Sequence, residues 1–108
     1  MITVSLYMKN GQMTGFGLCG HAGFAESGSD IVCAAVSVLV INTINAIEAF
    51  TEDTFRYSED EGKGSIEFRL LSEISEGTRL LLQTLMLGLS GIQEEYGKKY
   101  IRFQTEEV

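Results

Sequence analysis

A run of seventeen residues without a charge, residues 31–47, constrains the fold more than any other feature of this sequence. Ser29 and Asp30 precede it, and either side chain can accept from the first N–H groups of a helix, so a helix is predicted to about Phe50. The run is at the lower length limit for a membrane span, and its serine, threonine and asparagine side chains argue against insertion. We therefore predict a central helix, buried and partly covered by a second subunit, and no membrane partner.

The segment before this helix has the pattern of a β-hairpin. Apolar and polar residues alternate over Ile2–Met8, which predicts a half-buried strand. Asn10 and Gly11 both tolerate positive φ, so a tight turn is predicted there. A return strand is expected over about Thr14–Gly20.

A second hairpin and a second helix are predicted after the uncharged run. Apolar and polar residues alternate in residues 55–58 and 66–70, on either side of a polar turn at Ser58–Gly64. Leucines and other apolar residues recur at helical spacing over Thr78–Tyr96. Residues 100–103 suggest a last short strand.

The predicted order is therefore ββαββαβ, in a single domain that covers residues 1–108. This order predicts an α+β fold, with a mainly antiparallel sheet and both helices packed on one face. The two helices carry more apolar surface than one face of a sheet can cover. We therefore expect a homodimer.

The charge balance limits the classes of partner. Acidic residues outnumber basic ones by 15 to 8, which gives a net charge of −7. Such a surface disfavours direct binding to the phosphates of a nucleic acid and suits a basic protein partner. The first ten residues lack the pattern of a signal peptide, so a cytoplasmic protein with both thiols reduced is expected.

The sequence GFGLCG, Gly15–Gly20, fits the G-x-G-x-x-G phosphate-binding pattern. That motif needs its glycines between a strand and the start of a helix. Here they lie in a strand that returns from a hairpin, and the helix begins about ten residues later. A nucleotide-binding regulator is the weakest hypothesis, and close packing of the backbone explains these glycines better.

His21, the only histidine in the sequence, and Cys33 are the candidate reactive pair. Cys33 falls in the first turn of the predicted helix, where the partial positive charge favours a thiolate. His21 follows a strand, and the loop after it can bring the imidazole to the sulfur. Such a pair supplies a nucleophile and a general acid, and free N–H groups at the helix start could stabilise an oxyanion. The alternative is that His21 is structural or simply exposed and that Cys33 is a small core residue.

Asp30, Cys33 and Ser37 share one face of this helix by their spacing. Asp30 is expected to cap the helix, to orient His21, or both. For Ser37, a hydrogen bond near the sulfur and a bond to a carbonyl of its own helix are equally open. Cys19 lies within a strand and is interpreted as structural, although a disulfide with Cys33 stays open. One histidine and two cysteines make a poor closed zinc site, so no metal is expected.

The segment GHAGFAESGSDIVCAAVSVL, Gly20–Leu39, closely resembles the signature of the ribosomal-processing cysteine proteases, the Prp family. The GHAG box, the short Gly/Ser loop and the D-x-V-C-A-A-V-S block all match, with the separation that the family has. The resemblance extends over nearly the whole sequence, from the first hairpin to the leucine-rich second helix.

This resemblance implies a small α/β homodimer without a cofactor. It implies a cysteine endopeptidase that removes the N-terminal extension of the large-subunit ribosomal protein L twenty-seven, a step needed for ribosome assembly. By the same resemblance His21 is the general base, Cys33 is the nucleophile, and Asp30 and Ser37 line the site. The loop is expected to be mobile and to order over the peptide; its residues are Phe24, Ala25, Glu26, Ser27, Gly28 and Ser29. The alternative function is a non-catalytic acidic assembly factor that binds the same basic protein.

Overall fold

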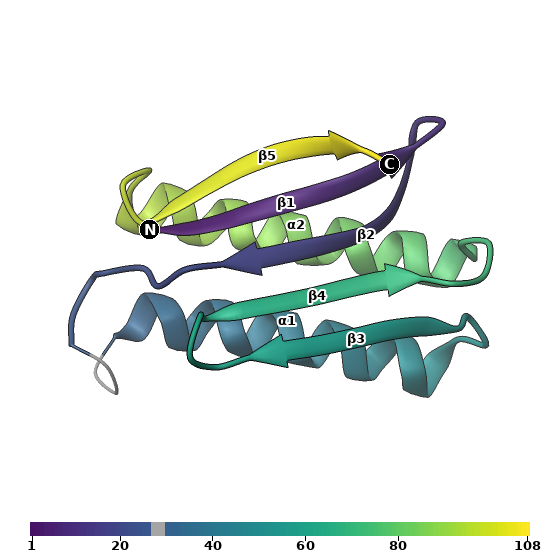
Figure 1. The fold of residues 1–108 in the computed structure, drawn as a ribbon, viewed down its shortest axis with the longest axis horizontal. Helices are drawn as coiled ribbons and strands as arrows, with labels where there is room; N and C mark the ends of the chain where they lie inside the picture. The colour runs from purple at the N-terminus through teal and green to yellow at the C-terminus, as the bar shows by residue number, and fades with distance from the viewer. Residues whose placement is uncertain (27–29) are drawn as a thin grey trace.

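The structure, a computed structural model, describes residues 1–26 and 30–108 of the chain. The elements follow the predicted order: β1 (Ile2–Lys9), β2 (Gln12–Cys19), α1 (Ile31–Phe50), β3 (Phe55–Asp60), β4 (Ser65–Leu70), α2 (Glu76–Tyr96) and β5 (Ile101–Glu107). The strands form one sheet in the order β3-β4-β2-β1-β5, and both helices cover the same face (Figure 1). β5 pairs with β1 in parallel, and the other pairs are antiparallel. The predicted α+β fold is confirmed.

The first hairpin turns at the predicted residues. Asn10 has φ of 52° and Gly11 has φ of 78°, which is the left-handed backbone that a tight hairpin turn requires. The turn connects Lys9 to Gln12, which are paired across the hairpin. The register shifts by one residue between Tyr7 and Met8, and from there β2 pairs regularly with β1 up to Cys19 at the end of the sheet.

α1 packs with one side against the sheet and against α2. Its buried residues recur at helical spacing: Val32, Val36, Val40, Thr43, Ile44 and Ile47. By length and composition alone this helix could cross a membrane, with a mean hydropathy of 1.9. Its outward side mixes polar residues with apolar ones such as Val38, which is 68% exposed. The core lies between this helical layer and the sheet, around the stacked rings of Phe16 and Phe68.

Four predicted elements have a wrong boundary, and each real element is longer; β2 begins at Gln12 rather than at about Thr14. β3 continues through Asp60, so the turn comprises only residues 61–64, because an exposed edge strand tolerates polar side chains while its backbone pairs with β4. α2 begins at Glu76, because the Ser75 hydroxyl accepts from the N–H of Thr78 and caps the helix. β5 runs to Glu107, because its backbone follows β1 to the end.

The glycines of GFGLCG serve close packing within the sheet. A Cβ atom on Gly15 would collide with the carbonyl oxygen of Phe68 on β4, and one on Gly17 would collide with the hydroxyl of Tyr7. Both glycines lie inside β2, and α1 does not begin until Ile31. The nucleotide-binding hypothesis is therefore wrong.

Tyr7 is buried on the face of the sheet opposite the helices, although the alternation in β1 predicts a solvent-facing side chain. Its hydroxyl donates to both carboxylate oxygens of Glu67, at 2.8 and 2.7 Å, and the guanidinium of Arg69 lies 4.1 Å from the centre of its ring. Burial, and then the hydrogen bond and charge of Glu67, raise the pKa of Tyr7 to about 12.

This raised pKa predicts a loss of stability at high pH. Because the folded protein favours the neutral phenol, its contribution is complete below the ordinary pKa of 10 and is lost as the pH rises toward 12. We expect the free energy of unfolding to fall by roughly 1 to 2 kcal/mol more between pH 9 and pH 11 in the wild type than in Tyr7→Phe. Urea titrations at both pH values measure this difference. Equal losses in the two proteins would contradict the assignment.

Candidate active site

His21 lies just beyond the end of β2, at one end of the sheet. Gly20, with φ of 98°, turns the chain out of the strand, and the next side chain, that of His21, is exposed while Ala22 is buried. The carbonyl oxygen of His21 accepts a hydrogen bond from the ammonium group of Met1, at the start of β1. The backbone of the histidine is thereby held by its neighbouring strand.

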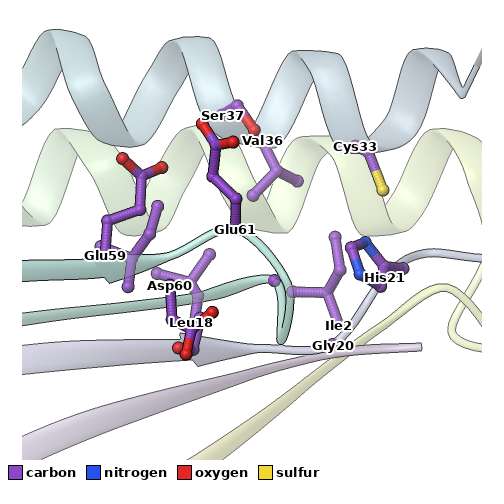
Figure 2. Close-up of a pocket in the computed structure, with 13 residues that line it drawn as sticks. Ile2, Leu18, Gly20, His21, Cys33, Val36, Ser37, Glu59, Asp60 and Glu61 are labelled. Carbon is purple, nitrogen blue, oxygen red and sulfur yellow. The ribbon is translucent and has the colours of Figure 1, made fainter. Parts of the chain in front are cut away.

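Cys33 is the third residue of α1 and is half-buried. Its sulfur accepts the backbone N–H of Ala22, with a distance of 3.2 Å between nitrogen and sulfur. In Figure 2 the sulfur and the His21 imidazole point toward one another. The structure therefore brings together the two residues that the sequence singles out, and an N–H group from the GHAG box stands beside the sulfur.

Asp30 caps α1 and holds the start of the loop at the same time. One carboxylate oxygen accepts from the N–H groups of Val32 and Cys33, both at 3.0 Å. The other accepts from Phe24 at 3.0 Å and from Ala25 at 3.4 Å. Burial acts to raise the pKa of Asp30, but the N–H groups of Cys33, Ala25 and Phe24 outweigh it and hold that pKa below its usual value. The predicted capping is seen, whereas no hydrogen bond joins Asp30 to His21 in the described part of the chain.

These bonds occupy two of the N–H groups at the helix start that are predicted to be free to stabilise an oxyanion. The N–H groups of Val32 and Cys33 are taken by the Asp30 carboxylate, and that of Ala34 donates to the Asp30 carbonyl at 3.1 Å. Helix capping and oxyanion binding compete for the same donors. Here the N–H groups of Val32 and Cys33 bind the capping aspartate. The hydrogen bond to the Cys33 sulfur comes from the N–H of Ala22.

The first part of the predicted mobile loop makes defined contacts. The ring of Phe24 meets Tyr96 and Tyr100 edge-to-face, with centroids 5.5 and 5.3 Å apart. Ala25 and Glu26 are exposed. Ser27, Gly28 and Ser29 lie outside the described residues, and the mobility of the loop stays a prediction.

Ser37 and Cys19 occupy different positions relative to the pair. Ser37 is exposed one turn after Cys33 and lines the same two cavities as Cys33 and His21. Neither of its two predicted hydrogen bonds occurs among residues 1–26 and 30–108. Cys19 is exposed at the end of β2 and contributes to the sheet through its backbone pairing with Thr3. Both thiols are free in the described chain, so the alternative of a Cys19–Cys33 disulfide is not seen.

Two cavities flank the reactive pair, and each is lined by His21, Cys33 and Ser37. One, of about 440 Å³, lies beside the loop and the start of α1. The other, of about 240 Å³, lies between α1, the ends of the central strands and the turn from β3 to β4. An extended peptide that passes over the sulfur can occupy both cavities. A peptide that is cleaved in its interior requires such space on both sides of the scissile bond.

Three carboxylates of the second cavity are not marked by the sequence. Glu59, Asp60 and Glu61 line it, and Figure 2 shows them on the side of the pocket away from Cys33. They reach the site because β4 pairs with β2 and the preceding turn lies beyond the end of β2. No local pattern specifies which strands are neighbours, and only a sheet order derived from elsewhere would have indicated these residues.

Comparisons with known proteins agree with this geometry. The sequence profile of the family described as Cysteine protease Prp matches residues 1–102. The ribosomal processing cysteine protease Prp of Staphylococcus aureus is 33% identical over 99 residues, which is 91% of this chain and 93% of that protein. The enzyme of the same name from Bacillus subtilis is 34% identical over 94 residues, 83% of each.

The fold is likewise shared with solved structures. The crystal structure of the essential ribosomal processing protease Prp from S. aureus, in complex with a covalently linked product peptide, superposes with a TM-score of 0.91 at 33% identity. The same protease in complex with a substrate peptide superposes with a TM-score of 0.86 at 32% identity. In both cases the similarity covers 98% of this chain and 100% of the other.

The bonds to Asp30 generate a prediction about stability and pH. Replacing it in Asp30→Ala should cost about 1 to 3 kcal/mol at pH 7, because the cap and the two loop bonds are lost together. Since the folded-state pKa is lowered, the deficit should shrink as the pH falls below the ordinary value of 3.8. Urea unfolding at pH 7 and pH 3 measures it. A deficit in Asp30→Ala that is the same at pH 7 and pH 3 would refute the prediction.

Proposed function

The chain belongs to the Prp family and is a cysteine protease, and from that premise we propose that it uses Cys33 and His21 to remove the N-terminal extension of ribosomal protein L twenty-seven. The observation that carries the proposal is that the Cys33 sulfur and the His21 imidazole point toward one another and line the same two cavities. The sulfur lines both cavities and accepts the N–H of Ala22.

The proposed reaction begins with transfer of the thiol proton to the imidazole. The resulting thiolate attacks the scissile carbonyl carbon and forms a carbon–sulfur bond. As the carbon–nitrogen bond breaks, the imidazolium gives its proton to the leaving amine. Water, deprotonated by the same imidazole, then hydrolyses the thioester and regenerates the thiol. The Ala22 N–H, 3.2 Å from the sulfur, stabilises the thiolate before the attack.

Charge supports a basic ribosomal protein as the substrate. The chain carries a net charge of −7, and three carboxylates, those of Glu59, Asp60 and Glu61, line a cavity at the reactive pair. Lysine-rich segments are attracted by such a surface, while nucleic-acid phosphates are repelled. A role in processing a ribosomal protein also places the enzyme in the cytoplasm. The alternative of a purely binding assembly factor is set aside, because this chain is a protease.

The central prediction concerns the two reactive side chains. Cys33→Ala and His21→Ala should each reduce cleavage of a peptide spanning the extension junction by at least about a thousandfold, because nucleophile and base act as a unit. Mass spectrometry of the peptide after incubation detects the products. Cys19→Ala, the matched control, should cleave at the wild-type rate. Unchanged cleavage by Cys33→Ala would sink the assignment, and failure of the wild type on this peptide but not on others would refute only the substrate.

We further propose that the enzyme acts as a homodimer through its helical layer. Large apolar side chains stand out from both helices, with Val38 68%, Leu80 64% and Leu87 75% exposed. A large contiguous apolar surface is rare on a monomer, so we propose that these side chains are covered by a second copy of the chain. Analytical ultracentrifugation should find a dimer in the wild type and a larger monomer fraction in Leu87→Lys. A monomeric wild type at high micromolar concentration would contradict the proposal.

A further inference from the structure

The turn between β3 and β4 reaches the catalytic histidine because of the sheet register. β2 and β4 run antiparallel with Leu18 opposite Ile66, so continuing the pairing by two residues puts Gly20 opposite Gly64. His21 follows Gly20 directly. Figure 2 shows the turn that carries Glu61 curving toward the histidine. The turn at residues 61–64, about forty residues after His21 in the sequence, therefore lies beside the imidazole.

Gly64 is the residue of this turn that lies beside the imidazole ring of His21. Its φ is 61°, and a Cβ atom built on it would lie 2.9 Å from Cε1 and 3.0 Å from Nε2 of His21. The same atom would lie 2.7 Å from the carbonyl oxygen of Gly20. Such distances are shorter than real Cβ atoms show, so a neighbour has to shift. The Gly20 oxygen is fixed in backbone, whereas the exposed imidazole can rotate.

We propose that Gly64 is a positioning residue for His21. Because Gly64 has no side chain, the imidazole can stay opposite the Cys33 sulfur. The proposal rests on the proposed Cys33–His21 pair. Any side chain at position 64 displaces the ring from the sulfur and weakens the proton exchange between them. Because small displacements of a reacting group reduce rate far more than binding, kcat should fall with little change in KM.

The charged groups around the imidazole are the same in the wild type and in both variants at position 64. Cys33 faces it from α1, and Asp30 lines one shared cavity. Carboxylates of β3 and its turn line the other, and they are Glu59, Asp60 and Glu61. The ammonium group of Met1 binds the histidine carbonyl. A substitution at position 64 adds no charge, so a change in pH dependence reports the distance between imidazole and sulfur.

The test is the rate at which iodoacetamide alkylates Cys33 as a function of pH, resolved from Cys19 by mass spectrometry. Cys33 in Gly64→Ala should be alkylated about tenfold more slowly at pH 6 than in the wild type, because the displaced imidazole accepts the proton of the thiol less readily. His21→Ala gives the profile of a sulfur without its partner. Gly11→Ala is the matched control, because its φ of 78° imposes the same backbone strain and nothing lies within 4 Å of its Cβ. It should keep the wild-type profile.

A second variant separates the collision from the strain. Asparagine tolerates positive φ but carries a Cβ, so Gly64→Asn should show the same slowed alkylation with less loss of stability. A wild-type profile in either folded variant overturns the proposal. If neither variant folds while Gly11→Ala does, Gly64 determines the fold and the proposal is likewise overturned.

Alkylation needs no substrate, so the two proposals fail separately. A wild type that cleaves the extension peptide, together with Gly64→Ala at the wild-type kcat and alkylation profile, refutes the positioning role alone. A wild type that cleaves nothing, with the expected shift in alkylation, refutes the proposed function and leaves the contact between Gly64 and His21 supported.

Discussion

Four backbone N–H groups converge on the carboxylate of Asp30, and this convergence joins the two segments that carry the reactive side chains. Two of the donors, the N–H groups of Val32 and Cys33, lie in the first turn of α1. The other two belong to Phe24 and Ala25, a few residues after His21. A buried carboxylate with this many donors stays ionised and fixes the geometry of all of them. Without it the helix start and the GHAG segment would keep only the hydrogen bond from the Ala22 N–H to the Cys33 sulfur among those given for the described residues.

This arrangement changes how charge on the sulfur is stabilised. A helix start usually favours a thiolate through its unpaired N–H groups. Here the carboxylate of Asp30 occupies the N–H groups of Val32 and Cys33 and brings a negative charge of its own. The remaining partners of the sulfur are the Ala22 N–H and the facing imidazole. The hydrogen bond to the sulfur therefore comes from the GHAG segment and not from the helix that carries the cysteine.

The sheet supplies the other half of the positioning. β1, β2 and β4 bring the segments around Met1, His21 and Gly64 to one end, where backbone contacts hold the histidine from both sides. Sheet registers are rigid, since a slip by one residue reverses every side chain. A rigid end of the sheet thus faces the start of a helix, and the cavities on either side of the pair leave room for an extended peptide. An exposed histidine can keep a defined place in this way.

The sequence by itself determined the seven elements, the turn at Asn10 and Gly11, the cap at Asp30 and the candidate pair of His21 and Cys33. These are local properties, because they depend on residues a few positions apart. The fixed spacing between the two halves of the motif identified the family. Only the tertiary structure decided that Asp30 takes the N–H groups assigned to an oxyanion, and that Glu59, Asp60, Glu61 and Gly64 belong to the site. The physical reason is that strand order and register arise from packing of the whole core, so no short stretch of sequence records which turn will face the histidine.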